Sequence, residues 1–144
     1  ALLFYHAVGR LARTIGVHVN VHPHSHHGSL LETAESYRYL MERLDAEIAL
    51  GPDSGHIVRG GQDLVQCVRK YAERIGHIHF KDVRDRAWTP VGEGSCDFAG
   101  VVRALREAGY GGWIIAEEES TWTLEGRTDI LRANREYIEH LLEA

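Results

Sequence analysis

The sequence predicts an α/β fold in which parallel strands alternate with amphipathic helices, and three observations support it. Short apolar strands are each followed by a segment with apolar residues at helical spacing, which predicts parallel strands joined by right-handed crossovers. Each predicted strand ends near a residue that can bind a metal ion. One strand has two different faces, because polar and apolar residues alternate along it: His77, Ile78, His79, Phe80 and Lys81.

The chain is expected to begin with a helix. Phe4, Val8, Leu11 and Ile15 recur at helical spacing, and Gly16 stands where a glycine commonly ends a helix. The first strand is predicted over residues 17–22, where three valines alternate with His18, Asn20 and His22. A polar loop, residues 23–29, follows it.

The second unit begins at Thr33, which is expected to cap a helix that has Glu35 in its first turn. Four apolar residues form the buried stripe of this helix: Tyr37, Leu40, Met41 and Leu44. The second strand is predicted from Glu47 to Asp53, and residues 51–56 are interpreted as a loop.

The last two units follow the same order. A third helix is predicted from Leu64 to Ile75, closed by Gly76, before the strand at 77–82. Residues 84–95 are interpreted as a loop, and Asp97 or Cys96 is expected to cap a fourth helix that ends at Gly109. Residues 113–117 form the last predicted strand, and residues 130–142 the last helix.

An open doubly wound sheet and part of a (β/α)8 barrel both fit this order, and the polar strand faces favour the barrel. Strands covered on both faces of an open sheet are continuously apolar, whereas the interior of a barrel near its catalytic mouth tolerates polar residues. A closed barrel needs about 250 residues. The 144 residues are therefore expected to form a single domain, 1–144, that supplies four βα units, half of such a barrel.

Composition excludes several classes of protein. The net charge of −5 gives no basic surface for nucleic acid or anionic membrane. No apolar run approaches the roughly 18 residues that span a bilayer. Cys67 and Cys96 show no pairing pattern, which favours a reducing, cytoplasmic location. The chain starts with Ala1 inside a predicted helix, so a fragment or a processed product is expected.

Four residues near the carboxyl ends of the predicted strands are the candidate ligands of one divalent cation: His22, Asp53, His79 and Glu117. Active sites of parallel barrels lie at these strand ends. Two imidazoles and two carboxylates suit Mn²⁺, Co²⁺, Zn²⁺ or Fe²⁺ better than Mg²⁺, which prefers oxygen ligands. An aspartate or glutamate at a strand end is by itself more often a helix cap or a solvated charge, so the prediction rests on the set.

Several motifs resemble those of the xylose isomerase-like TIM barrel superfamily, and in particular of its inosose (2-keto-myo-inositol) dehydratases. The resemblance runs in order over nearly the whole chain and corresponds to the C-terminal half of that barrel, its last four βα units. The motifs are His22-Pro23-His24, Gly28-Ser29, Glu32-Thr33, Asp53-Ser54-Gly55-His56, His77 to Arg84, Gly92-Glu93-Gly94, Asp97-Phe98, Gly109-Tyr110 and Gly112-Trp113 leading to Glu117.

The resemblance implies a site and a chemistry. Asp53, His79 and Glu117 would be metal ligands, with His22 where related sugar epimerases have a glutamate. The cation would be Mn²⁺ or Co²⁺, with Zn²⁺ or Mg²⁺ as alternatives. The residues that would contact the substrate are His56, Lys81, Arg84 and His24.

The implied reaction is proton abstraction next to a ketone of a sugar or cyclitol, through an enediolate. Glu117 or His22 would move the proton, and the outcome would be dehydration, epimerisation or isomerisation. The metal would stabilise the enediolate as a Lewis acid.

Two other classes stay open. The segment 53–56 also resembles that of endonuclease IV-type nucleases, although the negative net charge argues against DNA binding. The chain is alternatively a non-catalytic half-barrel. Because half of a barrel has two open strand edges, we expect it to associate with the missing half or with a second copy.

Overall fold

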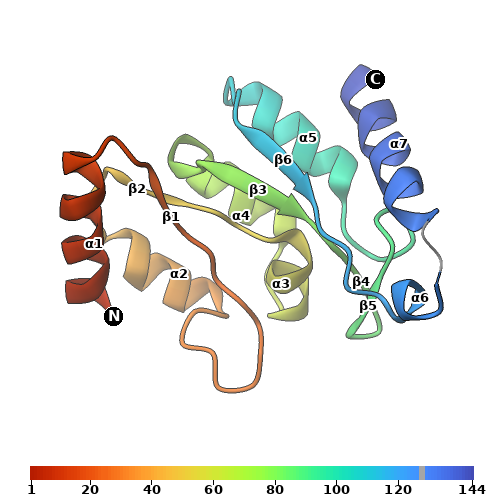
Figure 1. The fold of residues 1–144 in the computed structure, drawn as a ribbon, viewed down its shortest axis with the longest axis horizontal. Helices are drawn as coiled ribbons and strands as arrows, with labels where there is room; N and C mark the ends of the chain where they lie inside the picture. Colours follow the sequence, from red (N-terminus) through yellow and green to blue (C-terminus); the bar gives the residue numbers. More distant parts are fainter. Residues whose placement is uncertain (127–128) are drawn as a thin grey trace.

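The computed structural model describes residues 1–126 and 129–144, and its centre is a row of parallel strands (Figure 1). Strand β1 (Val19–Val21) pairs with β2 (Ile48–Leu50), and β3 (His77–Phe80) pairs with β6 (Trp113–Ala116). Parallel bridges from Leu50 to Ile75 and from Asp53 to His79 join the two pairs. The spatial order is therefore β1-β2-β3-β6, as the predicted strand–helix units require.

The predicted helices form near the predicted positions. They are α1 (Leu2–Thr14), α2 (Ala34–Met41), α4 (Leu64–Tyr71), α5 (Phe98–Glu107) and α7 (Ile130–Glu143), and a 3-10 turn, Ala72–Arg74, extends α4. Thr33 caps α2 by accepting from the backbone N–H of Ser36, and Asp97 caps α5 by accepting from that of Gly100. In Figure 1, the helices α2, α4, α5 and α7 lie one after another, from left to right, along the row of strands.

Two elements fall in segments that the sequence predicts to be loops, and a third lies where no element is predicted. Residues 51–56 do not form one loop, because Asp53 caps a short helix, α3 (Ser54–Arg59). Within residues 84–95, β5 (Ala87–Thr89) pairs antiparallel with β4 (Asp82–Arg84). A short helix, α6 (Thr121–Leu124), precedes α7. The strands are also shorter than predicted, so that Asp53 and Glu117 lie just beyond β2 and β6.

The core lies between the outer face of the strands and the helices. Val21, Ile48, Leu50, Ile78 and Phe80 are all 1% exposed or less. The stripe predicted for α2 is buried completely, whereas α1 buries only Ala12 and leaves much of its apolar stripe in solvent. None of the helices described is both long enough and apolar enough to cross a membrane.

Candidate metal centre

The four predicted ligand residues converge on the inner side of the strands. One ligand atom from each of His22, Asp53, His79 and Glu117 lies within 4.8 Å of the others. The strand register explains this, because Asp53 bridges to His79 and the N–H of Glu117 donates to the carbonyl of Phe80. Asp53 and Ile115 are the register partners of His79, and Glu117 lies two residues beyond Ile115, past the carboxyl end of β6.

Among the four ligand residues, Asp53 has a buried carboxylate oxygen that no described residue satisfies with a hydrogen bond. Its side chain is completely buried, and Oδ1 accepts from the backbone N–H of His56 at 2.9 Å as the cap of α3. Its Oδ2 is buried and has no partner among the described residues. Burial raises the pKa of this carboxyl to about 6. A buried carboxylate oxygen without a donor is what a cation ligand requires.

His22 is oriented by the backbone. Its Nδ1 lies 2.7 Å from the carbonyl oxygen of Gly51, and because a carbonyl can only accept, Nδ1 carries the proton. Nε2 of the neutral ring therefore keeps its lone pair for a metal ion or a proton. Burial lowers the pKa of His22, which favours this neutral form.

Glu117 is held between two side-chain donors. Its Oε2 accepts from Nδ1 of His79 in a short contact, and its Oε1 accepts from Nζ of Lys81 at 2.9 Å. Burial by itself would raise the pKa of Glu117, but these two hydrogen bonds outweigh it and lower the pKa to about 2. Glu117 is therefore ionised at any working pH.

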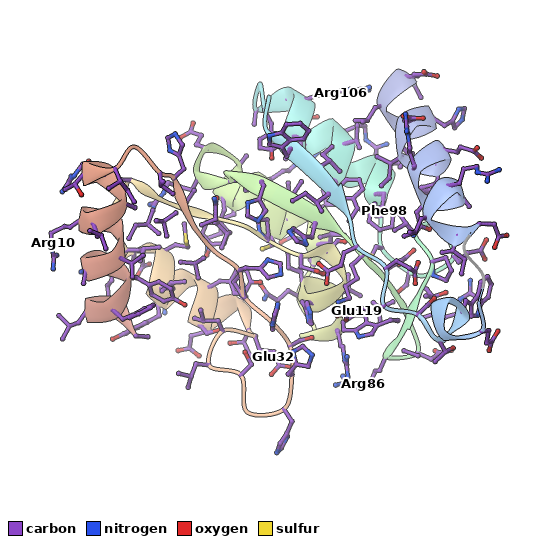
Figure 2. The ribbon with its side chains drawn as sticks, in the orientation of Figure 1. Arg10, Glu32, Arg86, Phe98, Arg106 and Glu119 are labelled. Atoms are coloured by element: carbon purple, nitrogen blue, oxygen red, sulfur yellow. The ribbon has the colours of Figure 1, made fainter. Side chains whose placement is uncertain are left out.

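Lys81 connects the centre to a second glutamate. Nζ also donates to Oε2 of Glu119, which is labelled in Figure 2, and lies 4.3 Å from the centroid of the Trp88 ring. Burial opposes its charge, but the hydrogen bonds to Glu119 and Glu117 raise the pKa of Lys81 overall. At 1% exposure, Lys81 is a buried cation neutralised by two carboxylates.

The predicted substrate contacts divide into two groups. The ring of His24 lies 4.7 Å from that of His22 and 4.6 Å from that of His56, so both histidines adjoin the ligand cluster. Arg84 does not: it is exposed on the β4–β5 hairpin and pairs with Glu93 at 3.7 Å. Glu32 is also outside the cluster, and its carbonyl accepts from the side-chain amide of Gln62.

Sequence reasoning missed two residues beside the centre. Ser25 is buried in the loop after β1 and contacts the ring of His56 through its N–H and its hydroxyl. Trp88, from the hairpin, contacts His56 edge-on and has Arg59 over its ring. Neither has a local sequence signal, because both contacts depend on tertiary packing.

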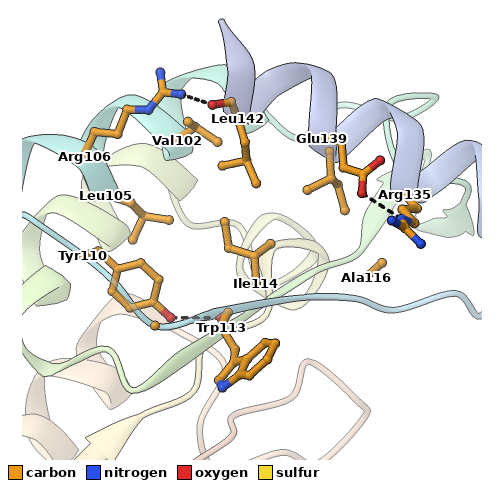
Figure 3. A pocket seen from close by; sticks show the side chains of 12 residues that line it. Val102, Leu105, Arg106, Tyr110, Trp113, Ile114, Ala116, Arg135, Glu139 and Leu142 are labelled. Atoms are coloured by element: carbon orange, nitrogen blue, oxygen red, sulfur yellow. Dashed lines mark hydrogen bonds and ion pairs between the residues drawn. The ribbon is translucent and has the colours of Figure 1, made fainter.

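An apolar groove lies away from the ligand cluster. Figure 3 shows it between α5, β6 and α7, with apolar walls that include Leu105, Tyr110, Ile114, Ile138 and Leu142. It contains none of the four ligand residues. The four ligand residues therefore lie on the inner face of the strands, and this groove lies on the outer face.

The chain is similar to known proteins over nearly its whole length. The family model described as "Xylose isomerase-like TIM barrel" matches residues 5–141. An inosose dehydratase of Geobacillus kaustophilus is 31% identical, and the match covers 95% of this chain and 50% of that protein. The chain thus spans about half the length of the curated relatives it matches.

Solved structures share the fold at low identity. The probable 3-DHS dehydratase AsbF from Bacillus anthracis superposes with a TM-score of 0.75 at 19% identity, covering 92% of this chain and 53% of that one. The IOLI protein, solved with a zinc atom, superposes with a TM-score of 0.77 at 17% identity, covering 94% of this chain and 52% of that one.

Proposed function

The chain belongs to the xylose isomerase-like TIM barrel family, and we propose from this membership that it carries the metal centre of an enzyme acting on a sugar or cyclitol. The reaction proposed is proton abstraction next to a ketone, with dehydration as in the inosose dehydratase relatives or epimerisation as its outcome. The observation that carries the proposal is the convergence of His22, Asp53, His79 and Glu117 within 4.8 Å.

We assign the binding of one divalent cation to Asp53, His79 and Glu117, with His22 beside them. The buried, unpartnered Oδ2 of Asp53 supports the fit. When bound, the ion would act as a Lewis acid on the ketone and stabilise the negative charge that develops on its oxygen. The mixed nitrogen and oxygen ligands favour Mn²⁺ or Co²⁺ over Mg²⁺. The cytoplasmic location of the protein stays a prediction.

The proton transfer is assigned to His22 rather than to Glu117. Lys81 and His79 hold the pKa of Glu117 at about 2, which makes this carboxylate a weak base and a suitable ligand. His22 is neutral, and the carbonyl of Gly51 fixes its Nδ1–H. Its Nε2 would take the proton from the carbon next to the ketone, and the carbonyl would stabilise the resulting imidazolium.

We further propose that the chain acts as half of a barrel, as one domain over residues 1–144. Strands β1 and β6 are the two ends of the row, and each leaves a strand edge without a partner among the described residues. Trp113 in β6 is 80% exposed, and Val17 beside β1 is 54% exposed. An enclosed site would therefore need a second set of four strand–helix units. Size-exclusion chromatography with light scattering should accordingly give a molar mass larger than that of one chain.

Solvent exchange tests the proposed reaction. The Mn²⁺-loaded protein in D₂O should place deuterium next to the ketone of inosose, measured by NMR, whether the product is dehydrated or epimerised. Glu117→Gln should abolish this exchange without changing the circular dichroism spectrum. Glu107→Gln, on the exposed surface beside Arg69, is the matched control. Full deuterium exchange by Glu117→Gln would refute the assignment of Glu117 as a metal ligand that the reaction requires.

A further inference from the structure

A second histidine cluster lies next to the metal centre. His24, His26 and His56 each offer a ligand atom within 4.8 Å of the others. The first two are exposed and belong to the loop after β1, whereas His56 is 2% exposed and belongs to α3. Three histidines at this distance would be read as a second metal site.

The orientation of the rings argues against metal binding by this cluster. The rings of His24 and His56 are stacked, with centroids 4.6 Å apart and planes 28° apart. An imidazole binds a metal through a lone pair in the plane of its ring. In-plane lone pairs of two stacked rings run side by side, so they do not converge on one ion.

The protonation of His56 argues the same way. The backbone N–H of Ser25 donates to Nδ1 of His56 at 2.9 Å, and a backbone N–H can only donate. Nδ1 is therefore an acceptor, and the proton of the neutral ring must be on Nε2. An imidazolium has a proton on both ring nitrogens, so a ring whose Nδ1 accepts a hydrogen bond is neutral.

His22 and His56 thus have opposite tautomers. His22 has its proton on Nδ1 and a lone pair on Nε2, whereas His56 has the lone pair on Nδ1 and the proton on Nε2. The ring of His56 cannot easily turn over, because it lies between the stacked ring of His24 and the edge of Trp88. None of the described residues accepts a hydrogen bond from its Nε2–H.

We propose that Ser25 is a positioning residue: it fixes His56, the substrate contact that the family resemblance implies, as an Nε2–H donor rather than a metal ligand. Ser25 acts through two groups, its N–H and its hydroxyl, each 2.9 Å from Nδ1. Both are buried with the side chain. The ligand recognised is an oxygen with a free lone pair, such as a ketone or a developing alkoxide. The substrate part of this inference rests on the proposed function.

The tautomer is tested without any activity. Two-bond ¹⁵N–¹H spectra of the full chain with labelled histidine distinguish a protonated Nε2 from a protonated Nδ1. We expect Nε2–H for His56 and Nδ1–H for His22 in the wild type. Nδ1–H for His56, or a shift of its signals on adding one equivalent of Zn²⁺ like that of a ligand, would overturn the proposal.

The role of Ser25 is tested by reversing the hydrogen bond. The carboxylate of Ser25→Asp would accept from Nδ1, so the proton of His56 should move from Nε2 to Nδ1. Ser29→Asp adds the same charge to the same loop away from His56 and should leave the tautomer unchanged. A folded Ser25→Asp protein that keeps Nε2–H would overturn the role of Ser25. If that variant does not fold, the wild-type spectrum still decides.

Two substitutions of His56 test the donor. The amide nitrogen of Gln can take the place of Nε2, whereas Asn reaches only the position of Nδ1. In the solvent-exchange assay His56→Gln should therefore retain at least tenfold higher kcat/KM than His56→Asn, as one hydrogen bond to a charged oxygen implies. Equal values would contradict the donor role. Absence of exchange in the wild type would instead refute the proposed function and leave the tautomer result standing.

Discussion

Replacing Asp53 by Asn tests the claim that the buried carboxylate of Asp53 is a cation ligand whose charge destabilises the fold when no cation is bound. The amide has the same shape, and its oxygen can still accept from the N–H of His56 and cap α3. What changes is the charge on a side chain with no exposure and one unpartnered oxygen. The variant therefore separates the electrostatic contribution of Asp53 from its role as a helix cap.

The magnitude follows from the pKa of Asp53. Its rise from 3.8 to about 6 on folding, caused by burial, corresponds to about 3 kcal/mol. Below pH 4 the carboxyl is protonated in both states and this cost is absent. Between pH 4 and 6 the unfolded chain releases its proton while the folded chain keeps it, so the wild type loses stability as pH rises. Above pH 6 the full cost is present.

The assay is urea unfolding in excess EDTA at several pH values between 4 and 7.5. The free energy of unfolding of Asp53→Asn minus that of the wild type should rise by about 3 kcal/mol across this range. Asp63→Asn is the control, because Asp63 caps α4 in the same way but is exposed. A difference that does not vary with pH would refute the reasoning, as would an equal rise in the control.

Three further predictions concern the ion, the loop beside the centre and the core. Saturating Mn²⁺ should raise the Tm of the wild type at pH 7.5 and leave that of Asp53→Asn unchanged in differential scanning fluorimetry, because binding to the folded state alone stabilises it; equal shifts in both would contradict the ligand assignment. Asp82→Ala should cost at least about 3 kcal/mol in urea unfolding, since the buried carboxylate accepts from four backbone N–H groups, those of Val83, Gly92, Gly94 and Cys96; a cost near that of exposed Asp85→Ala would count against it. Phe80→Ala should cost about 3 to 5 kcal/mol and Trp113→Ala within about 0.5 kcal/mol in the single chain, as their exposures of 0% and 80% require; similar costs would show that the core is elsewhere.

The inner face of the strands was predictable because a period of two separates the two faces of a strand. Once β3 is recognised, His77 and His79 must lie opposite Ile78 and Phe80. The alignment of His22, Asp53 and Glu117 with His79 followed from placing each near a carboxyl end. The alternation of polar and apolar residues within short strands therefore predicted that residues far apart in the sequence come together. The resemblance to a known family indicates the same residues.

The missed parts depend on contacts that no local pattern encodes. The sequence predicts Asp53 as the end of a strand, whereas in the structure β2 ends at Leu50 and Asp53 caps α3. The resemblance implies Arg84 as a substrate contact, but in the structure Arg84 is exposed on the hairpin and pairs with Glu93. Ser25 looked like part of a polar loop, and only the fold brings its N–H to His56.

The central claim is that one cation binds between Asp53, His79 and Glu117 with His22 beside it. Anomalous diffraction from crystals of the protein soaked in Mn²⁺ tests this most directly. We predict a single strong peak within bonding distance of Oδ2 of Asp53 and of ligand atoms of His79 and Glu117, with Nε2 of His22 facing it. A peak at His24, His26 and His56, or no peak among the strand-end residues, would contradict the account.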